Sequence, residues 1–217
     1  MSSRDKILRA ASRLFRKQGY HATGLSQITA ESGAPRGSLY YYFPGGKEEL
    51  AQEAIQLTGE RIKAYILSVI RREADPVKAF QSYIQMMADG IEEYIMEEND
   101  DIPIVSVAAE TWSFSERLRQ TCEQVYQDWQ LVYQDKLLQS GYAPETAETL
   151  SVAIQAMIEG AYVLSVTKKA AGLLVQPPNK FLFTKTIIKG GKCKWNKLKR
   201  LLHDYRNLNR RKFSRSD

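Results

Sequence analysis

The residues whose types and spacing are best suited to binding chemistry lie close together near the N-terminus. Arg36, Gly37 and Ser38 open a short predicted helix, and Tyr40 and Tyr41 follow about one turn later. An arginine can donate two hydrogen bonds to guanine, and a serine hydroxyl can contact a base or a phosphate. A glycine at such a position lets the helix backbone approach a duplex closely. The pattern therefore predicts contacts with double-stranded DNA.

Packing is the alternative explanation for the tyrosines of this segment. Leu39 and Phe43 are four residues apart and so share the helix face that would anchor it to a core. We assign Tyr42 to packing and Tyr40 to the DNA-facing side. For Tyr41 both interpretations stay open at this point.

Two helices must precede this segment in order to position it. Apolar residues recur at helical spacing from Ile7 to Phe15, which predicts a helix over residues 4–18. Ser3 is the expected N-cap of this helix and Gly19 its stop. A second helix is expected over residues 25–32.

The connection to the third helix has the features of a tight turn. Gly33 can adopt the left-handed conformation that ends the second helix, and Pro35 fits the first position of a third helix that reaches Phe43. Two short helices joined by a glycine-containing turn are the layout of a helix-turn-helix.

The rest of the chain to residue 168 keeps a helical period. A long fourth helix is expected over residues 47–73, and three further apolar stripes follow over 77–94, 118–132 and 147–164. Prolines mark the breaks near residues 75–76, 101–103 and 140–144. We therefore predict an all-α protein with a three-helix DNA-binding domain and a larger helical body.

The segment from Ile7 to Leu50 resembles the DNA-binding domain of TetR-family repressors. The matching residues are Phe15, Gly19-Tyr20, Thr23, Ile28, Gly33, Arg36-Gly37-Ser38-Leu39-Tyr40, Tyr42-Phe43 and Lys47-Glu48-Glu49-Leu50. Pro35 departs from the pattern because serine is common there. The link Pro44-Gly45-Gly46 is one residue longer than usual, and in this the chain resembles the LmrA/YxaF-like branch.

The resemblance implies a role for each matching position. The residues that resemble the DNA-reading positions are Arg36, Gly37, Ser38, Tyr40 and Tyr41. Thr23, Lys47 and the start of the first helix resemble phosphate contacts, which agrees with the attraction of helix N-termini and lysines for phosphate.

For the larger body the resemblance implies a homodimer and a small-molecule effector. We expect the helix over residues 147–164 at the dimer interface. The aromatic and thioether side chains favour a small hydrophobic or planar aromatic ligand. Its predicted contacts are Met87, Glu110, Trp112, Trp129, Tyr133 and Met157, for which core packing is the competing explanation.

These expectations combine into a sequence-specific repressor that leaves its operator DNA when the effector binds. The alternative is a helical adaptor protein that uses its helix-turn-helix for protein contacts. An enzyme is not expected, because His21 and His203 are the only histidines and neither has an evident catalytic partner in the sequence. We expect no cofactor and no metal, and assign the acidic run over residues 92–101 to a solvated helix end.

The formal net charge of +6 hides a strong asymmetry along the chain. Residues 1–50 carry +4, residues 51–178 carry −9 and residues 179–217 carry +11. Without a continuous apolar run or a signal sequence, we expect a cytoplasmic protein with no membrane partner. Cys122 and Cys193 are too far apart for a metal motif, and Cys122 falls on an apolar stripe.

The expected domains are residues 1–46 for DNA binding, 47–178 for ligand binding and dimerisation, and a basic tail over 179–217. A second dimer helix would fall near residues 172–190, but Pro177 and Pro178 interrupt it. Two interpretations of the tail remain. It is either a disordered or non-native sequence, for example from a shifted reading frame, or a basic arm that binds DNA without sequence preference.

Overall fold

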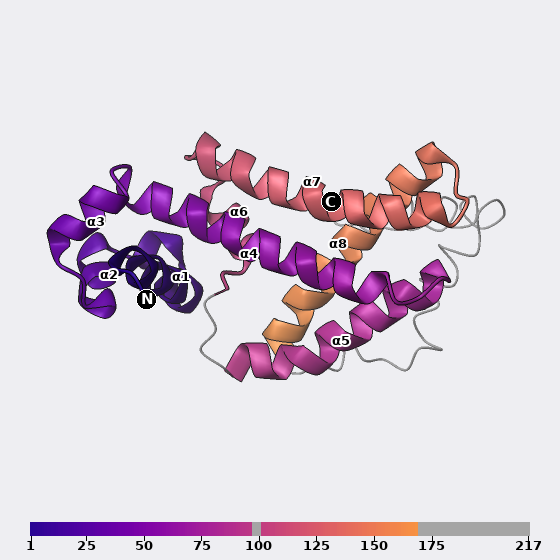
Figure 1. The fold of residues 1–217 in the computed structure, drawn as a ribbon, viewed down its shortest axis with the longest axis horizontal. Coiled ribbons are helices and arrows are strands. Elements are labelled where there is room, and N and C mark those ends of the chain that lie inside the picture. Colours follow the sequence, from indigo (N-terminus) through magenta and orange to yellow (C-terminus); the bar gives the residue numbers. More distant parts are fainter. Residues whose placement is uncertain (97–100, 169–217) are drawn as a thin grey trace, which may run out of the picture.

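A computed structural model describes residues 1–96 and 101–168 of the 217, with the side-chain environments of residues 1–87 and 101–167. These residues form eight α-helices and no strand (Figure 1), which confirms the all-α class. The helices are α1 (Ser3–Ala22), α2 (Leu25–Ser32), α3 (Arg36–Tyr42), α4 (Gly46–Ile70), α5 (Pro76–Met96), α6 (Ile104–Thr111), α7 (Glu116–Gln139) and α8 (Pro144–Lys168). The predicted tail, the second dimer helix and residues 97–100 of the acidic run lie outside the described residues.

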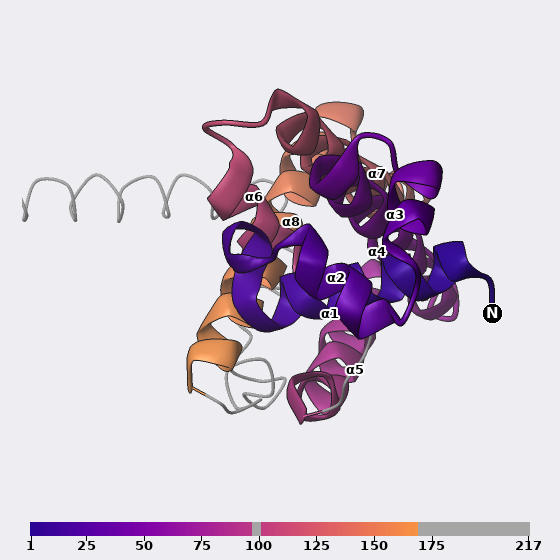
Figure 2. The same cartoon turned by 90° about the vertical axis from the view of Figure 1, so that its left-hand side faces the viewer.

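The helices are arranged as a small head and a larger body joined by α4. In Figure 1, α1, α2 and α3 gather at one end, and α4 runs from them along most of the molecule. In the body α4 packs against α7, and α7 packs against α8. Figure 2 views the molecule from the head and shows α1 and α2 in front of the body helices.

Helix α1 differs from its prediction at both ends. Its N-cap is Ser2 rather than Ser3, because the Ser2 hydroxyl accepts the Asp5 N–H while the Asp5 carboxylate accepts the Ser2 N–H. Gly19 interrupts the helix, as expected, with a φ of 85°. One more turn then continues to Ala22, so Gly19 produces a kink and does not end the helix.

The helix-turn-helix has the predicted layout. Helix α2 has the predicted bounds, and Gly33 ends it in the left-handed conformation with a φ of 63°. Pro35 is the N-cap of α3 and not its first residue. Leu39 and Phe43 are fully buried, as expected for the anchoring face of α3. Tyr42, which we assigned to packing, keeps 36% of its surface exposed.

The body contains the expected long helices and one that the sequence did not indicate. Helix α4 ends at Ile70, three residues before the predicted end, and Cys122 on α7 is buried as expected. The eight residues of α6 are too few for a helical period to stand out from chance. This short helix lies between the head and α7, and contacts both.

Helix α8 exposes an unusual amount of apolar surface. By length and composition alone it is apolar enough to cross a membrane, although a core or interface helix meets the same description. Val152, Val163, Leu164 and Val166 each have between 39% and 52% of their surface exposed. Within the part of the chain that the structure describes, this face is not covered by another helix.

Candidate DNA-binding surface and ligand pocket

The outer face of α3 presents most of the predicted DNA-reading residues. Arg36 and Gly37 are exposed, as are Tyr40 at 48% and Tyr41 at 79%, while Ser38 is partly exposed. The opposite face of the same helix is buried through Leu39, which fixes its rotation. A short helix with one anchored apolar face and one open polar face can enter a major groove.

Thr23 occupies a different environment from the one that a phosphate contact requires. Only 1% of its surface is exposed, and its hydroxyl donates a hydrogen bond to the Gly19 carbonyl at 2.7 Å. The Gln18 amide in turn donates to the same hydroxyl at 3.4 Å. This placement favours a role in holding the kink of α1 over a direct phosphate contact.

Lys47 lies at the start of α4 and reaches back to α1. Its ammonium donates to the Tyr20 carbonyl at 3.0 Å and lies 4.4 Å from the centre of the Tyr20 ring. Partial burial lowers the pKa of Lys47, and the nearby Glu110 carboxylate opposes this shift. In this arrangement Lys47 holds the head to α4, and a phosphate contact remains a proposal.

Glu110, a predicted ligand contact, is engaged with the head of the molecule. It lies between the body and the head, where its carboxylate accepts the backbone N–H of His21 at 3.1 Å. A β-carbon on Gly19 would come within 2.7 Å of this carboxylate, so the missing side chain of Gly19 makes the contact possible. The His21 ring packs on Phe114 with ring centres 4.6 Å apart. Glu110 and Phe114 therefore connect the body to the last turn of α1.

The body contains a cavity of about 540 Å³ between α4, α5, α7, α8 and the segment that leads into α6. Met87, Trp129 and Tyr133 line it, as predicted, and the Trp129 indole donates to the Gly59 carbonyl at 3.0 Å. The other lining residues are Arg61, Ile62, Tyr65, Tyr83, Met86, Asp101, Ile102, Pro103, Ile104, Val105, Gln155, Ile158, Glu159 and Tyr162. Its size and mainly apolar wall suit a small organic ligand.

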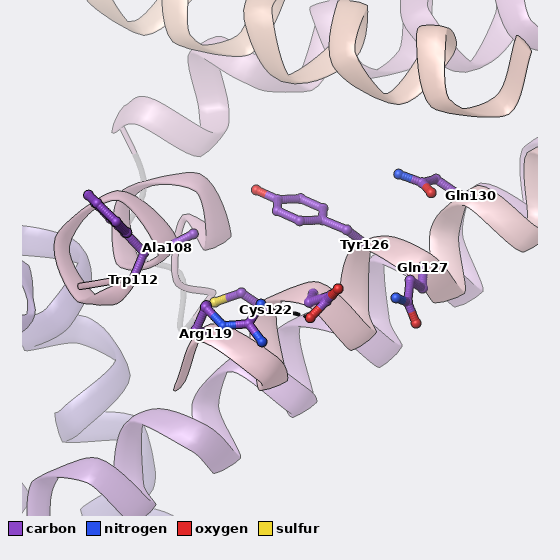
Figure 3. A pocket seen from close by; sticks show the side chains of 8 residues that line it. Ala108, Trp112, Arg119, Cys122, Tyr126, Gln127 and Gln130 are labelled. Carbon is purple, nitrogen blue, oxygen red and sulfur yellow. Dashed lines mark hydrogen bonds and ion pairs between the residues drawn. The ribbon is translucent and has the colours of Figure 1, made fainter. Parts of the chain in front are cut away.

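Trp112 and Met157, two further predicted ligand contacts, are absent from this wall. Trp112 is 66% exposed and lines a shallower hollow of about 410 Å³ between α6 and α7 (Figure 3). Figure 3 shows Ala108 beside it on α6, and Arg119 and Tyr126 on α7. Arg119 is paired with Glu123 at 2.9 Å. Met157 is half-buried and packs against the core.

The sequence interpretation missed the most polar part of the cavity wall. Glu159 and Gln155 lie one turn apart on α8, and the Gln155 amide donates to the Glu159 carboxylate at 2.8 Å. Burial raises the pKa of Glu159 to about 7. A signal was available, because Glu159 is the one acidic residue in the apolar stretch from Val152 to Val166.

Comparisons with known proteins agree with this arrangement. Residues 7–54 match the family model of bacterial regulatory proteins of the TetR family, and residues 76–176 match that of the C-terminal domain of LmrA/YxaF-like transcriptional regulators. The chain is 47% identical to the uncharacterised regulator YxaF of Bacillus subtilis, over 77% of its own length and 86% of the relative. It is 44% identical to LmrA of the same species, over 77% and 88% respectively.

Solved structures show the same fold. The reduced form of Escherichia coli NemR has a TM-score of 0.69 at 17% identity, covering 85% of this chain and 97% of the other. A TetR-family regulator from Cytophaga hutchinsonii has a TM-score of 0.72 at 18% identity, covering 86% and 93%.

The fold and the helix-turn-helix together define a DNA-binding transcriptional regulator, which is not an enzyme. The chain belongs to the TetR family, and within it to the LmrA/YxaF-like regulators.

Proposed function

We propose that this regulator is a repressor that binds operator DNA as a homodimer and leaves it when a small hydrophobic or aromatic ligand occupies the cavity. The observation that carries the proposal is the two-sided character of α3. Leu39 is buried, whereas Arg36, Tyr40 and Tyr41 are open to a duplex. Since the similar proteins are bacterial transcriptional regulators, which meet their DNA in the cytoplasm, we place this protein there.

The proposed dimer uses the exposed apolar face of α8. Covering this face with the same face of a second copy would remove the apolar surface from water and would pair the two heads about a two-fold axis. Two recognition helices about one turn of DNA apart then read the two halves of a palindromic site.

The proposed release depends on elements that contact both the cavity and the head. Helix α4 lines the cavity with Arg61, Ile62 and Tyr65, and its first turn carries the head. Helix α6 begins at the cavity and ends with Glu110 against α1. We propose that α4 and α6 have two arrangements, one that suits operator DNA and one that does not. A ligand that binds the second arrangement more tightly changes the separation of the heads.

We retain residues 1–46 and 47–178 as the proposed domains and 179–217 as a separate tail.

A gel shift on the DNA upstream of the protein's own gene tests the DNA-binding surface. We expect Arg36→Ala and Tyr40→Ala each to weaken binding about tenfold or more, because each removes a contact with the duplex. Arg72→Ala is the matched control, since Arg72 is exposed just beyond the far end of α4. Binding by both head variants at the strength of the unmodified protein would refute the assignment of α3.

A further inference from the structure

The cavity wall on α8 carries hydrogen-bond acceptors that the protein itself does not use. Gln155 is 5% exposed, and its amide N–H donates to Glu159, which leaves its side-chain oxygen pointing elsewhere. That oxygen accepts no hydrogen bond from the part of the chain that the structure describes. Among the described residues, Gln155 is the one donor to Glu159. A buried acceptor without a donor is unfavourable, so this pair is suited to a donor brought by a ligand.

Among the residues that the structure describes, no unpaired positive charge lies next to Glu159. It faces the hydroxyl groups of Tyr83 on α5 and of Tyr126 and Tyr133 on α7, and burial raises the pKa of all three tyrosines. Arg61 of α4 is the one cation among the described residues that line the cavity. Its guanidinium is paired with Asp101 at 2.8 Å. An ionised Glu159 is therefore a largely buried charge that has no counterion within residues 1–87 and 101–167.

The remaining walls of the cavity are suited to a flat positive group. Tyr65, Trp129 and Tyr162 line it together with two methionines and several aliphatic side chains. Aromatic faces attract cations, most strongly where water is excluded. A carboxylate beside aromatic rings therefore binds a nitrogen cation better than it binds a neutral group of the same shape.

We propose that the cavity selects a ligand with a cationic, N–H-bearing nitrogen on a flat apolar body, with Glu159 as the counterion and the Gln155 oxygen as the second acceptor. The proposal rests on the cavity being the effector site proposed above, and it adds the chemical class of the effector. Neutral aromatic compounds of the same size that lack an N–H or O–H group fill the cavity less favourably because they leave both acceptors unpaired.

The pH dependence of binding follows from the pKa of Glu159, which is about 7. Below this pH the carboxyl is protonated, and a cation must displace the proton. Above it, the ionised carboxylate is available. Affinity for a permanent cation should thus rise about tenfold between pH 6 and pH 8. Tyr83, Tyr126 and Tyr133 stay neutral over this range, because their pKa values are raised.

Fluorescence titration of the full chain, without DNA, tests the proposal with two probes. These are 9-aminoacridine, a cation at pH 6–8, and acridine, its neutral analogue at pH 8. At pH 8 we expect the cation to bind about tenfold tighter or more. Glu159→Gln should abolish this preference and its pH dependence. Glu148→Gln, at an exposed position on the same helix, should retain both.

Equal affinities for the two probes, or an unchanged preference in Glu159→Gln, would overturn the proposal. Circular dichroism of the variants confirms that they fold. The outcome is independent of the proposed repression, which is measured separately as release of operator DNA. Selective binding of the cation without release would leave the cation site intact and refute its role as the effector site. If acridine released the operator DNA and 9-aminoacridine did not, the proposed function would stand and the selection of a cation would be refuted.

Discussion

A carboxyl group on the wall of an apolar cavity is ionised less easily than one in water, because burial disfavours the charged form. Glu159 shows this effect, with a pKa raised from 4.5 to about 7. Its one hydrogen bond, from Gln155, favours ionisation but is too weak to offset the loss of hydration. The protonation of this residue is therefore coupled both to folding and to whatever the cavity binds.

The raised pKa of Glu159 predicts a loss of stability at high pH. Between about pH 4.5 and pH 7 the unfolded chain releases a proton that the folded chain retains, so the free energy of unfolding falls as pH rises. Above pH 7 the full cost, about 3 kcal/mol, is present. In urea titrations Glu159→Gln should be more stable than the unmodified protein at pH 8 and similar to it at pH 4.5. A difference that does not vary with pH would contradict the assignment.

Glu110 shows that closeness in the sequence is a weak guide to a shared environment in the structure. We placed it in the pocket because it lies beside Trp112. Residues two apart near the end of a helix point in nearly opposite directions, so they rarely share an environment. In the structure Glu110 faces the head and Trp112 faces solvent.

Helix α3 has one face that stabilises the head and another that is free for DNA. Leu39 is fully buried and Tyr41 is the most exposed tyrosine of the helix. Substitutions on the buried face should therefore lower the free energy of unfolding, and substitutions on the exposed face should weaken DNA binding.

Leu39→Ala and Tyr41→Ala form a matched pair that tests this separation. We expect Leu39→Ala to lower the free energy of unfolding by about 3 kcal/mol, since it leaves a cavity in the core of the head. Tyr41→Ala should change it by less than about 0.5 kcal/mol and still weaken operator binding. Urea denaturation and gel shifts measure the two effects. A large loss of stability in Tyr41→Ala would instead support packing as its role.

At the scale of the whole molecule, the apolar face of α8 is the surface that we propose for the dimer. Leu164 is 52% exposed in the single chain, and burying such side chains in a symmetric interface would contribute favourably to association. In the proposed dimer, the two DNA-binding heads would be held at a fixed separation. Operator binding should therefore depend on it.

Leu164→Glu should convert the proposed dimer into monomers, because it introduces a charge into each half of the interface. Light scattering after size-exclusion chromatography should report half the mass, and operator affinity should fall at least about tenfold. Leu57→Glu, at an exposed leucine of α4, serves as the control. A monomeric unmodified protein, or a Leu164→Glu protein of unchanged mass, would exclude this interface.

The sequence by itself determined the helix-turn-helix, because that element is local. The bounds of α2, the turn at Gly33 and the anchoring by Leu39 depend on periodicity, on φ preferences and on residues a few positions apart. The long body helices were predictable for the same reason.

Only the tertiary structure decided which side chains form the cavity. Its wall combines residues from four long helices and from the segment 101–105, and no local pattern specifies how those elements pack. Packing therefore placed Met87, Trp129 and Tyr133 in the wall, excluded Glu110, Trp112 and Met157, and added Glu159. Thr23 shows the same distinction. Its position in the motif can be recognised from neighbouring residues in the sequence, whereas its burial depends on how α1 kinks at Gly19.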